Sequence, residues 1–107
     1  MEKFVNFKFV EEDQKNMYLE CLSDESIRKI LISITDIPKS VIEISNEQNI
    51  PLRTVYRKIQ FLYDNKLLKI SGAITESGKK FFLYKSKIKG ISSNFIEDEL
   101  IVRVIAN

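Results

Sequence analysis

The stretch NIPLRTVYRKIQFLYDNKLLKI, residues 49–70, decides the fold, because it predicts an amphipathic helix followed directly by a strand. Val55, Ile59 and Leu62 recur at helical spacing, which predicts a stripe of buried side chains. The opposite arc is polar and mostly cationic: it consists of Arg53, Tyr56, Arg57 and Gln60, with Thr54 and Lys58 at its edges. We therefore expect a helix over 51–66 that packs on a core with one side and presents positive charge on the other.

Two shorter helices are expected upstream of this stretch. In DESIRKILISI, which follows Ser23, apolar residues recur at helical spacing and two acidic residues occupy the first turn, as in a capped amphipathic helix. Ser40 and Glu43 fit a capping box, in which each side chain accepts a hydrogen bond from the backbone amide of the other residue. The helix that follows should be about two turns long, because Asn49 and Pro51 interrupt it.

A β-hairpin is expected after the long helix. Asn65 can take the left-handed conformation that ends helices, LLKIS predicts a strand, and KKFFLYKSKIK predicts a returning strand. The seven residues GAITESG, 72–78, would form the tip between the two strands. Alternation along the returning strand places Lys85, Lys87 and Lys89 on one face, either as a solvated edge or as a nucleic-acid contact.

The two ends of the chain predict further elements. A short strand is expected over 4–10 and a short helix over 12–22. Gly90 allows a bend or bulge, after which ISSNFI and ELIVRVIAN, separated by EDE, predict a second hairpin. Its last strand is apolar on both faces: Leu100, Val102 and Val104 lie on one side, and Ile101, Arg103 and Ile105 on the other. Both faces need cover, which a second copy of the chain could supply.

Length and composition predict one globular domain without catalytic or metal chemistry. The chain has 107 residues, of which 44% are hydrophobic and 30% charged, and this suits a single core. It lacks a secretory signal and an apolar run of membrane-spanning length, so we expect a cytoplasmic protein. The absence of histidine removes the usual zinc sites and catalytic pairs, so we expect no enzyme, cofactor or metal. The single cysteine, Cys21, is either a small buried hydrophobe or a redox or dimer-linking thiol.

Positive charge is concentrated in the middle of the sequence. Residues 51–90 hold ten Lys/Arg against two Asp/Glu, a balance of +8, whereas residues 1–50 hold six against ten and residues 91–107 one against three. Such a cluster on a helix and the hairpin after it is the electrostatic footprint of a phosphate-binding surface. A plainly solvated face is the alternative interpretation.

The predicted order of elements resembles a winged helix-turn-helix domain. Helix-turn-helix sequences place a small residue, a turn residue, an aliphatic residue and a β-branched anchor where this chain has Ser45, Asn49, Ile50 and Val55. TVYRKIQFLYDNKLLKI is similar to the recognition helix and first wing strand of the ArsR-like group, and GKKFFLYKSKI to its returning wing strand. The chain departs from that group in three ways. It lacks the metal-sensing ligands, its C-terminus predicts strands where that group commonly dimerises through terminal helices, and it carries Lys66 where the family often has glycine.

The resemblance implies an α+β fold, with a three-helix core plus a β-hairpin wing and an additional C-terminal β-hairpin. The domain would span 23–89, preceded by an extension over 1–22 and followed by a hairpin over 90–107 as a possible dimerisation element.

The resemblance also implies a homodimeric, sequence-specific transcription regulator that binds double-stranded DNA. Arg53, Tyr56, Arg57 and Gln60 would face bases, and Thr54 and Lys58 would contact phosphates. A wing over 70–82 would reach the flanking backbone, and its contacts would come from Thr75, Ser77, Lys79 and Lys80. The arginines and the wing tip would then form one cationic ridge.

The alternative is a protein-interaction module that binds a partner through its C-terminal strands. In that case Arg53→Glu should leave function intact, whereas a charge at Val102 or Val104 should abolish it.

Overall fold

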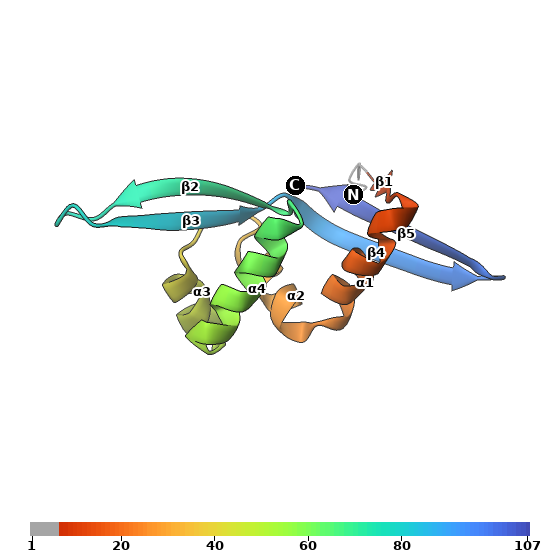
Figure 1. The fold of residues 1–107 in the computed structure, drawn as a ribbon, viewed down its shortest axis with the longest axis horizontal. Helices are drawn as coiled ribbons and strands as arrows, with labels where there is room; N and C mark the ends of the chain where they lie inside the picture. The colour runs from red at the N-terminus through yellow and green to blue at the C-terminus, as the bar shows by residue number, and fades with distance from the viewer. Residues whose placement is uncertain (1–6) are drawn as a thin grey trace, which may run out of the picture.

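The computed structural model describes residues 7–107 as a mixed α+β fold with four α-helices and two small antiparallel sheets (Figure 1). In chain order the elements are β1 (Phe7–Phe9), a 3₁₀ turn (Glu12–Gln14), α1 (Lys15–Ser23), α2 (Glu25–Ser33), α3 (Val41–Gln48), α4 (Leu52–Asp64), β2 (Leu68–Ile74), β3 (Lys80–Ser86), β4 (Ile88–Ile96) and β5 (Glu99–Ala106). Residues 4–6 of the strand predicted over 4–10 lie outside the described residues.

The two hairpins point in opposite directions, and the helices lie on one side of them (Figure 1). The β2–β3 hairpin forms one sheet, and the other has the strand order β1-β5-β4. The molecule is accordingly elongated, with extents of 57 × 32 × 23 Å. Within 7–107, no helix combines the length and the apolar character that crossing a membrane requires.

Side-chain caps fix the starts of α2 and α3. The cap of α2 is Asp24 rather than Ser23, because the Asp24 carboxylate accepts from the Ile27 amide at 2.9 Å. The Ser23 hydroxyl instead donates to a carbonyl inside α1. The capping box predicted for α3 is confirmed: Ser40 Oγ accepts from the Glu43 amide at 3.2 Å, and Glu43 Oε1 accepts from the Ser40 amide at 3.0 Å.

A tight turn joins α3 to α4. Asn49 takes the left-handed conformation with φ of 54°, which allows the Ile50 amide to donate back to the Ser45 carbonyl at 3.1 Å. The Ser45 hydroxyl in turn donates to the Ile50 carbonyl at 2.6 Å. Ile50 within the turn and Val55 in the first turn of α4 are both buried, so the four positions singled out in the sequence all contribute to this connection.

The end of α4 differs from the prediction. Asn65 has φ of −92°, and Lys66 is the left-handed residue, with φ of 63°. Its amide donates to Tyr63, and the Leu67 amide donates to Leu62, the two bonds of a Schellman motif. Asn65 is the C-cap, and its side-chain amide donates to the Phe61 carbonyl, while Lys66 bears the left-handed conformation that glycine would adopt more easily.

The core lies between the helices and the inner faces of both sheets. It includes the predicted stripe of α4, with Val55, Ile59 and Leu62 at 0%, 4% and 0% exposure. Its other members are Tyr18, Cys21, Ile27, Ile30, Ile34, Val41, Ile44, Ile50, Leu67, Leu68, Ile88, Val102 and Val104. Each fully buried aliphatic side chain contributes about 1.5–3 kcal/mol, which holds α4 in a fixed orientation on the core.

The β2–β3 hairpin is longer than predicted, and its tip is shorter. The loop expected over 72–78 is wrong at its start, because β2 continues to Ile74 and Gly72 pairs with Phe82. The tip is closed by two backbone bonds of 2.9 Å, from the Thr75 amide to Lys79 and from the Gly78 amide to Thr75. Pairing along seven residues of each strand stabilises the longer form.

The second sheet joins the two ends of the chain. β1 pairs with β5 in a register that sets Phe7 opposite Ile105, and β4 pairs with β5 through a register shift at Gly90, as predicted from that glycine. The turn between them consists of Glu97 and Asp98, both with positive φ, so Glu99 belongs to β5 and not to the loop.

The predicted row of three lysines is wrong. Lys85 lies in β3 and Lys89 in β4, and the chain changes sheet between them. The amide of Lys87 donates to the Leu67 carbonyl at this junction, so no single strand carries all three.

Candidate nucleic-acid interface

The outer face of α4 presents two arginines. Arg53 and Arg57 are exposed, as is Tyr56 between them at 53%. Neither guanidinium lies within 4.0 Å of a carboxylate of residues 7–107. Because the apolar stripe of α4 is buried, these side chains project away from the core and are available to an external anion.

Lys58 and Gln60, predicted to contact DNA, have partners within the protein. Lys58 Nζ donates to Asp24 Oδ2 at 2.6 Å, and the Gln60 amide donates to Asp64 Oδ1 at 2.8 Å. Thr54 is half-buried at the edge of the arc. Phosphate binding by Lys58 would have to compete with Asp24, whereas the two arginines face no such competition among the described residues.

The contact with Lys58 favours the ionised, carboxylate form of Asp24. Its burial alone would raise its pKa, but the hydrogen bond and charge of Lys58 and the backbone amides of Ile27 and Ser26 outweigh burial and lower the pKa. Asp24 therefore joins the start of α2 to the middle of α4 and fixes the orientation of the side of α4 that carries Arg53 and Arg57.

The wing tip combines two internally bonded hydroxyls with two lysines. Thr75 Oγ1 and Ser77 Oγ lie 2.9 Å apart, and Thr75 Oγ1 also accepts from the Lys79 amide at 3.0 Å. These hydroxyls shape the tip, while the side chains of Lys79 and Lys80 are exposed. The tip lies at the far end of the hairpin from the junction between the sheets (Figure 1).

A groove separates α4 from the β2–β3 hairpin, and the sequence did not reveal it. It measures about 410 Å³ and is lined by Ile59, Gln60, Tyr63, Leu68, Ile70, Phe82 and Tyr84. The cationic ridge expected from the sequence is therefore interrupted by an apolar and aromatic surface. Alternating positions along the hairpin carry Ile70, Phe82 and Tyr84, so the sequence did contain the pattern of this apolar face. The prediction missed it because the loop over 72–78 placed Gly72 outside the strand pairing.

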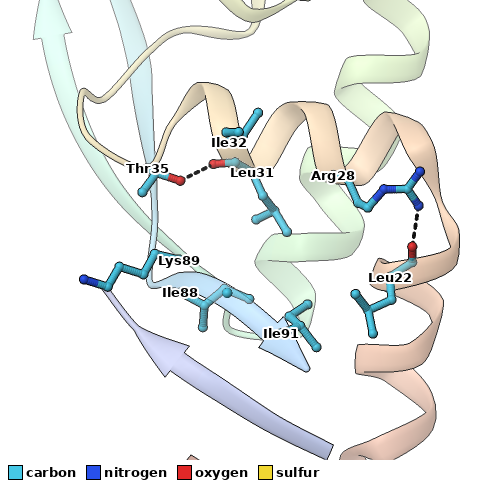
Figure 2. Close-up of a pocket in the computed structure, with 9 residues that line it drawn as sticks. Leu22, Arg28, Leu31, Ile32, Thr35, Ile88, Lys89 and Ile91 are labelled. Carbon is cyan, nitrogen blue, oxygen red and sulfur yellow. Dashed lines mark hydrogen bonds between the residues drawn. The ribbon is translucent and has the colours of Figure 1, made fainter. Parts of the chain in front are cut away.

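A second hollow, of about 190 Å³, lies between α2 and β4 (Figure 2). Its lining is mainly aliphatic, from residues such as Leu31, Ile88 and Ile91. Arg28, which donates to the Leu22 carbonyl, and Lys89 lie at opposite ends of it (Figure 2). Because these two cations lie apart, they do not form a single charged binding site in this hollow.

The C-terminal sheet leaves one face uncovered by the described residues, on which apolar side chains lie among Ser92, Asn94, Glu99 and Arg103. Val102 and Val104, expected to contact a partner in the alternative interpretation, are buried at 1% and 9%, so that choice of residues is wrong. The opposite face carries Phe9, which is 77% exposed, and Phe7, whose ring lies 4.8 Å from the Arg103 guanidinium. We call this the outer face.

No family model, curated protein or solved structure matches this chain. The part of the chain described by the structure also contains no group of three or more His, Cys, Asp or Glu side chains placed to hold a metal ion. The observations that bear on function are therefore the geometry of α4 and of the β2–β3 hairpin.

Proposed function

We propose that this chain is a cytoplasmic transcription regulator of the winged helix-turn-helix type, similar to the ArsR-like group, that binds double-stranded DNA. Three observations support the winged-helix assignment: α2, α3 and α4 are followed by the β2–β3 hairpin, Asn49 makes a left-handed turn before α4, and Lys39 forms a bridge with Tyr84 of β3. The bridge adds a short third chain segment to the sheet of the wing.

In this proposal α4 enters the major groove. The groove is about 12 Å wide, which matches the diameter of a helix with its side chains. Arg53 and Arg57 are four residues apart and therefore lie on one side of α4, where each can donate two hydrogen bonds to the O6 and N7 atoms of guanine. Lys79 and Lys80 at the tip would contact phosphates of the flanking backbone.

The observation that carries the proposal is the exposure of Arg53 and Arg57 without a carboxylate partner among residues 7–107. Lysines of the helices are paired with carboxylates, Lys29 with Glu25 at 3.1 Å and Lys58 with Asp24, whereas Arg28 donates to the Leu22 carbonyl. On α4, the positive charge without a carboxylate partner among the described residues therefore lies on the side that faces away from the core, at Arg53 and Arg57.

Binding to DNA can be tested by fluorescence anisotropy, first with a pool of random-sequence duplexes and then with a duplex selected from it, across salt concentrations. Log affinity should fall linearly with log salt. Arg53→Gln or Arg57→Gln should weaken binding to the selected duplex by about 1–3 kcal/mol. Lys29→Gln on α2 removes the same charge as a control and should change affinity little. Failure to bind any duplex at low salt would contradict the proposal.

We also propose a homodimer that forms through the outer face. Phe9 and Ile96, 77% and 66% exposed, lie on this face with Ile101 and Ile105, and such a surface is unfavourable in water. Sedimentation velocity should detect a dimer that Phe9→Glu dissociates. A monomer at all concentrations would contradict this part of the proposal.

The outer face also supports the second candidate function, a protein-interaction module without DNA binding. In that case Arg53→Glu should leave partner binding intact, whereas Phe9→Glu should abolish it. If Arg53→Glu abolished partner binding and Phe9→Glu did not, this candidate would be excluded.

A further inference from the structure

The groove between α4 and the wing has one helical wall and one sheet wall. Gln60 and Tyr63 come from α4, while Ile70, Phe82 and Tyr84 come from one face of the hairpin. The hairpin residues share a face because Ile70 pairs with Tyr84, and Phe82 lies two residues away along β3. The groove is therefore built from two rigid elements rather than from a loop.

The aromatic side chains in the groove are accessible to a ligand. Tyr63 and Phe82 are 51% and 61% exposed. The cross-strand partner of Phe82 is Gly72, and a Cβ built on Gly72 would meet no atom within 4 Å. Gly72 places no side chain directly opposite Phe82, and the ring is largely exposed, so a flat apolar group can lie against it.

Positive charge lies at one end of this groove. A neighbouring hollow of about 330 Å³ shares Tyr63 and Leu68 with the groove and is also lined by Asp64, Lys66 and Lys87. Both lysines are exposed, and neither lies within 4.0 Å of a carboxylate of the described residues. The Asp64 carboxylate, which accepts from the Gln60 amide, lines the same hollow, so two lysines and one carboxylate give it a formal balance of +1.

We propose that this groove binds an unpaired nucleotide, with its base against Tyr63 and Phe82 and its phosphate near Lys66 and Lys87. The inference rests on the proposed function, because the same α4 would hold the adjoining duplex. Aromatic side chains beside cations are the common arrangement for single-stranded nucleic acids, since every base has a face that can stack. A paired base offers only its edges, so the groove favours DNA with an unpaired position over a plain duplex.

The test compares two DNA probes of one sequence, a plain duplex and the same duplex with a single bulged thymidine, by competition anisotropy. Stacking of one base predicts a preference of roughly 5- to 140-fold for the bulged probe. Phe82→Ala should reduce the preference to less than about 2-fold while leaving plain-duplex affinity unchanged. Phe95→Ala, which removes a 72% exposed ring from the other hairpin, should keep the preference.

Photocrosslinking gives a second measurement that does not depend on a variant. With 5-iodouracil at the bulged position, the crosslink should form to Tyr63, Phe82 or Tyr84. Equal affinity for the two probes, a preference retained by Phe82→Ala, or a crosslink outside the groove would overturn the inference and leave duplex binding in place. Failure to bind either probe would overturn the proposed function as well.

Discussion

Replacing Asp24 with serine is expected to destabilise the fold while strengthening DNA binding. One Asp24 oxygen accepts from the Ile27 amide at 2.9 Å, and the other accepts from the Lys58 ammonium at 2.6 Å. Serine keeps the N-cap, because its hydroxyl can accept from the same amide, but removes the ion pair. The variant therefore isolates the contribution of the Lys58 contact.

The expected loss follows from the partial burial of this pair. The side chains of Lys58 and Asp24 are 19% and 23% exposed, so water screens the pair less than it screens a surface pair. Exposed pairs contribute about 0.2–1 kcal/mol, and breaking a fully buried pair costs about 3–5 kcal/mol. We expect Asp24→Ser to lower the free energy of unfolding by roughly 1–2 kcal/mol. Asp24→Ala also loses the cap and should cost about 1 kcal/mol more.

The same contact gives stability a defined pH dependence. Because the folded-state pKa of Asp24 is lowered, its stabilisation is fully present above the unfolded-state value of about 3.9 and is lost as pH falls through the folded-state pKa. Wild-type protein should therefore lose more stability than Asp24→Ser on acidification from about pH 5 to pH 2.

Urea unfolding followed by circular dichroism measures the stability change, and salt-dependent anisotropy measures the change in DNA binding. In Asp24→Ser the released Lys58 can reach a phosphate, so the slope of log affinity against log salt should steepen by about 0.9. This steeper salt dependence should disappear when Lys58→Met is combined with Asp24→Ser. Unchanged stability together with unchanged DNA binding in Asp24→Ser would refute this reasoning.

Three further predictions concern packing and reactivity. Ile30→Ala should lower the free energy of unfolding, measured in urea, by about 2–5 kcal/mol, because this side chain is fully buried. Ile32→Ala, at a 73% exposed position of the same helix, should change it by less than about 0.5 kcal/mol in the same assay. Gly90→Val should cost about 1–3 kcal/mol in the same assay, because its Cβ would approach an isoleucine of β5 to 2.6 Å, while Gly72→Ala meets no atom and should be tolerated. Burial, followed by the nearby acidic side chains, raises the pKa of Cys21 to about 11, so its thiol should resist alkylation at pH 8 until urea unfolds the protein; rapid labelling of folded protein would contradict this.

Local patterns predicted the helices well because each depended on residues close in sequence. The stripe of Val55, Ile59 and Leu62 and the capping box of Ser40 and Glu43 required only helical periodicity and one turn of hydrogen bonding. The end of the short helix near Asn49 was predicted in the same way, whereas the left-handed conformation was expected at Asn65 and is found at Asn49 and Lys66.

Predictions that depended on distant residues were less complete. The pairing of β1 with β5 joins the two ends of the chain, and no nearby residue specifies it. The contact between Lys58 and Asp24 spans 34 positions, so the sequence could not show that this cation has a partner. The groove beside α4 also depended on register, since only the pairing of Gly72 with Phe82 shows that the aromatic ring is uncovered.

The most direct test of the account is a map of backbone amide chemical shifts of ¹⁵N-labelled protein titrated with the selected duplex. We predict the largest changes in α4 around Arg53 and Arg57 and at the wing tip near Lys79 and Lys80, with small changes in β1 and β5. The largest changes on the outer face, with α4 unaffected, would contradict the claim that α4 presents the DNA-binding surface.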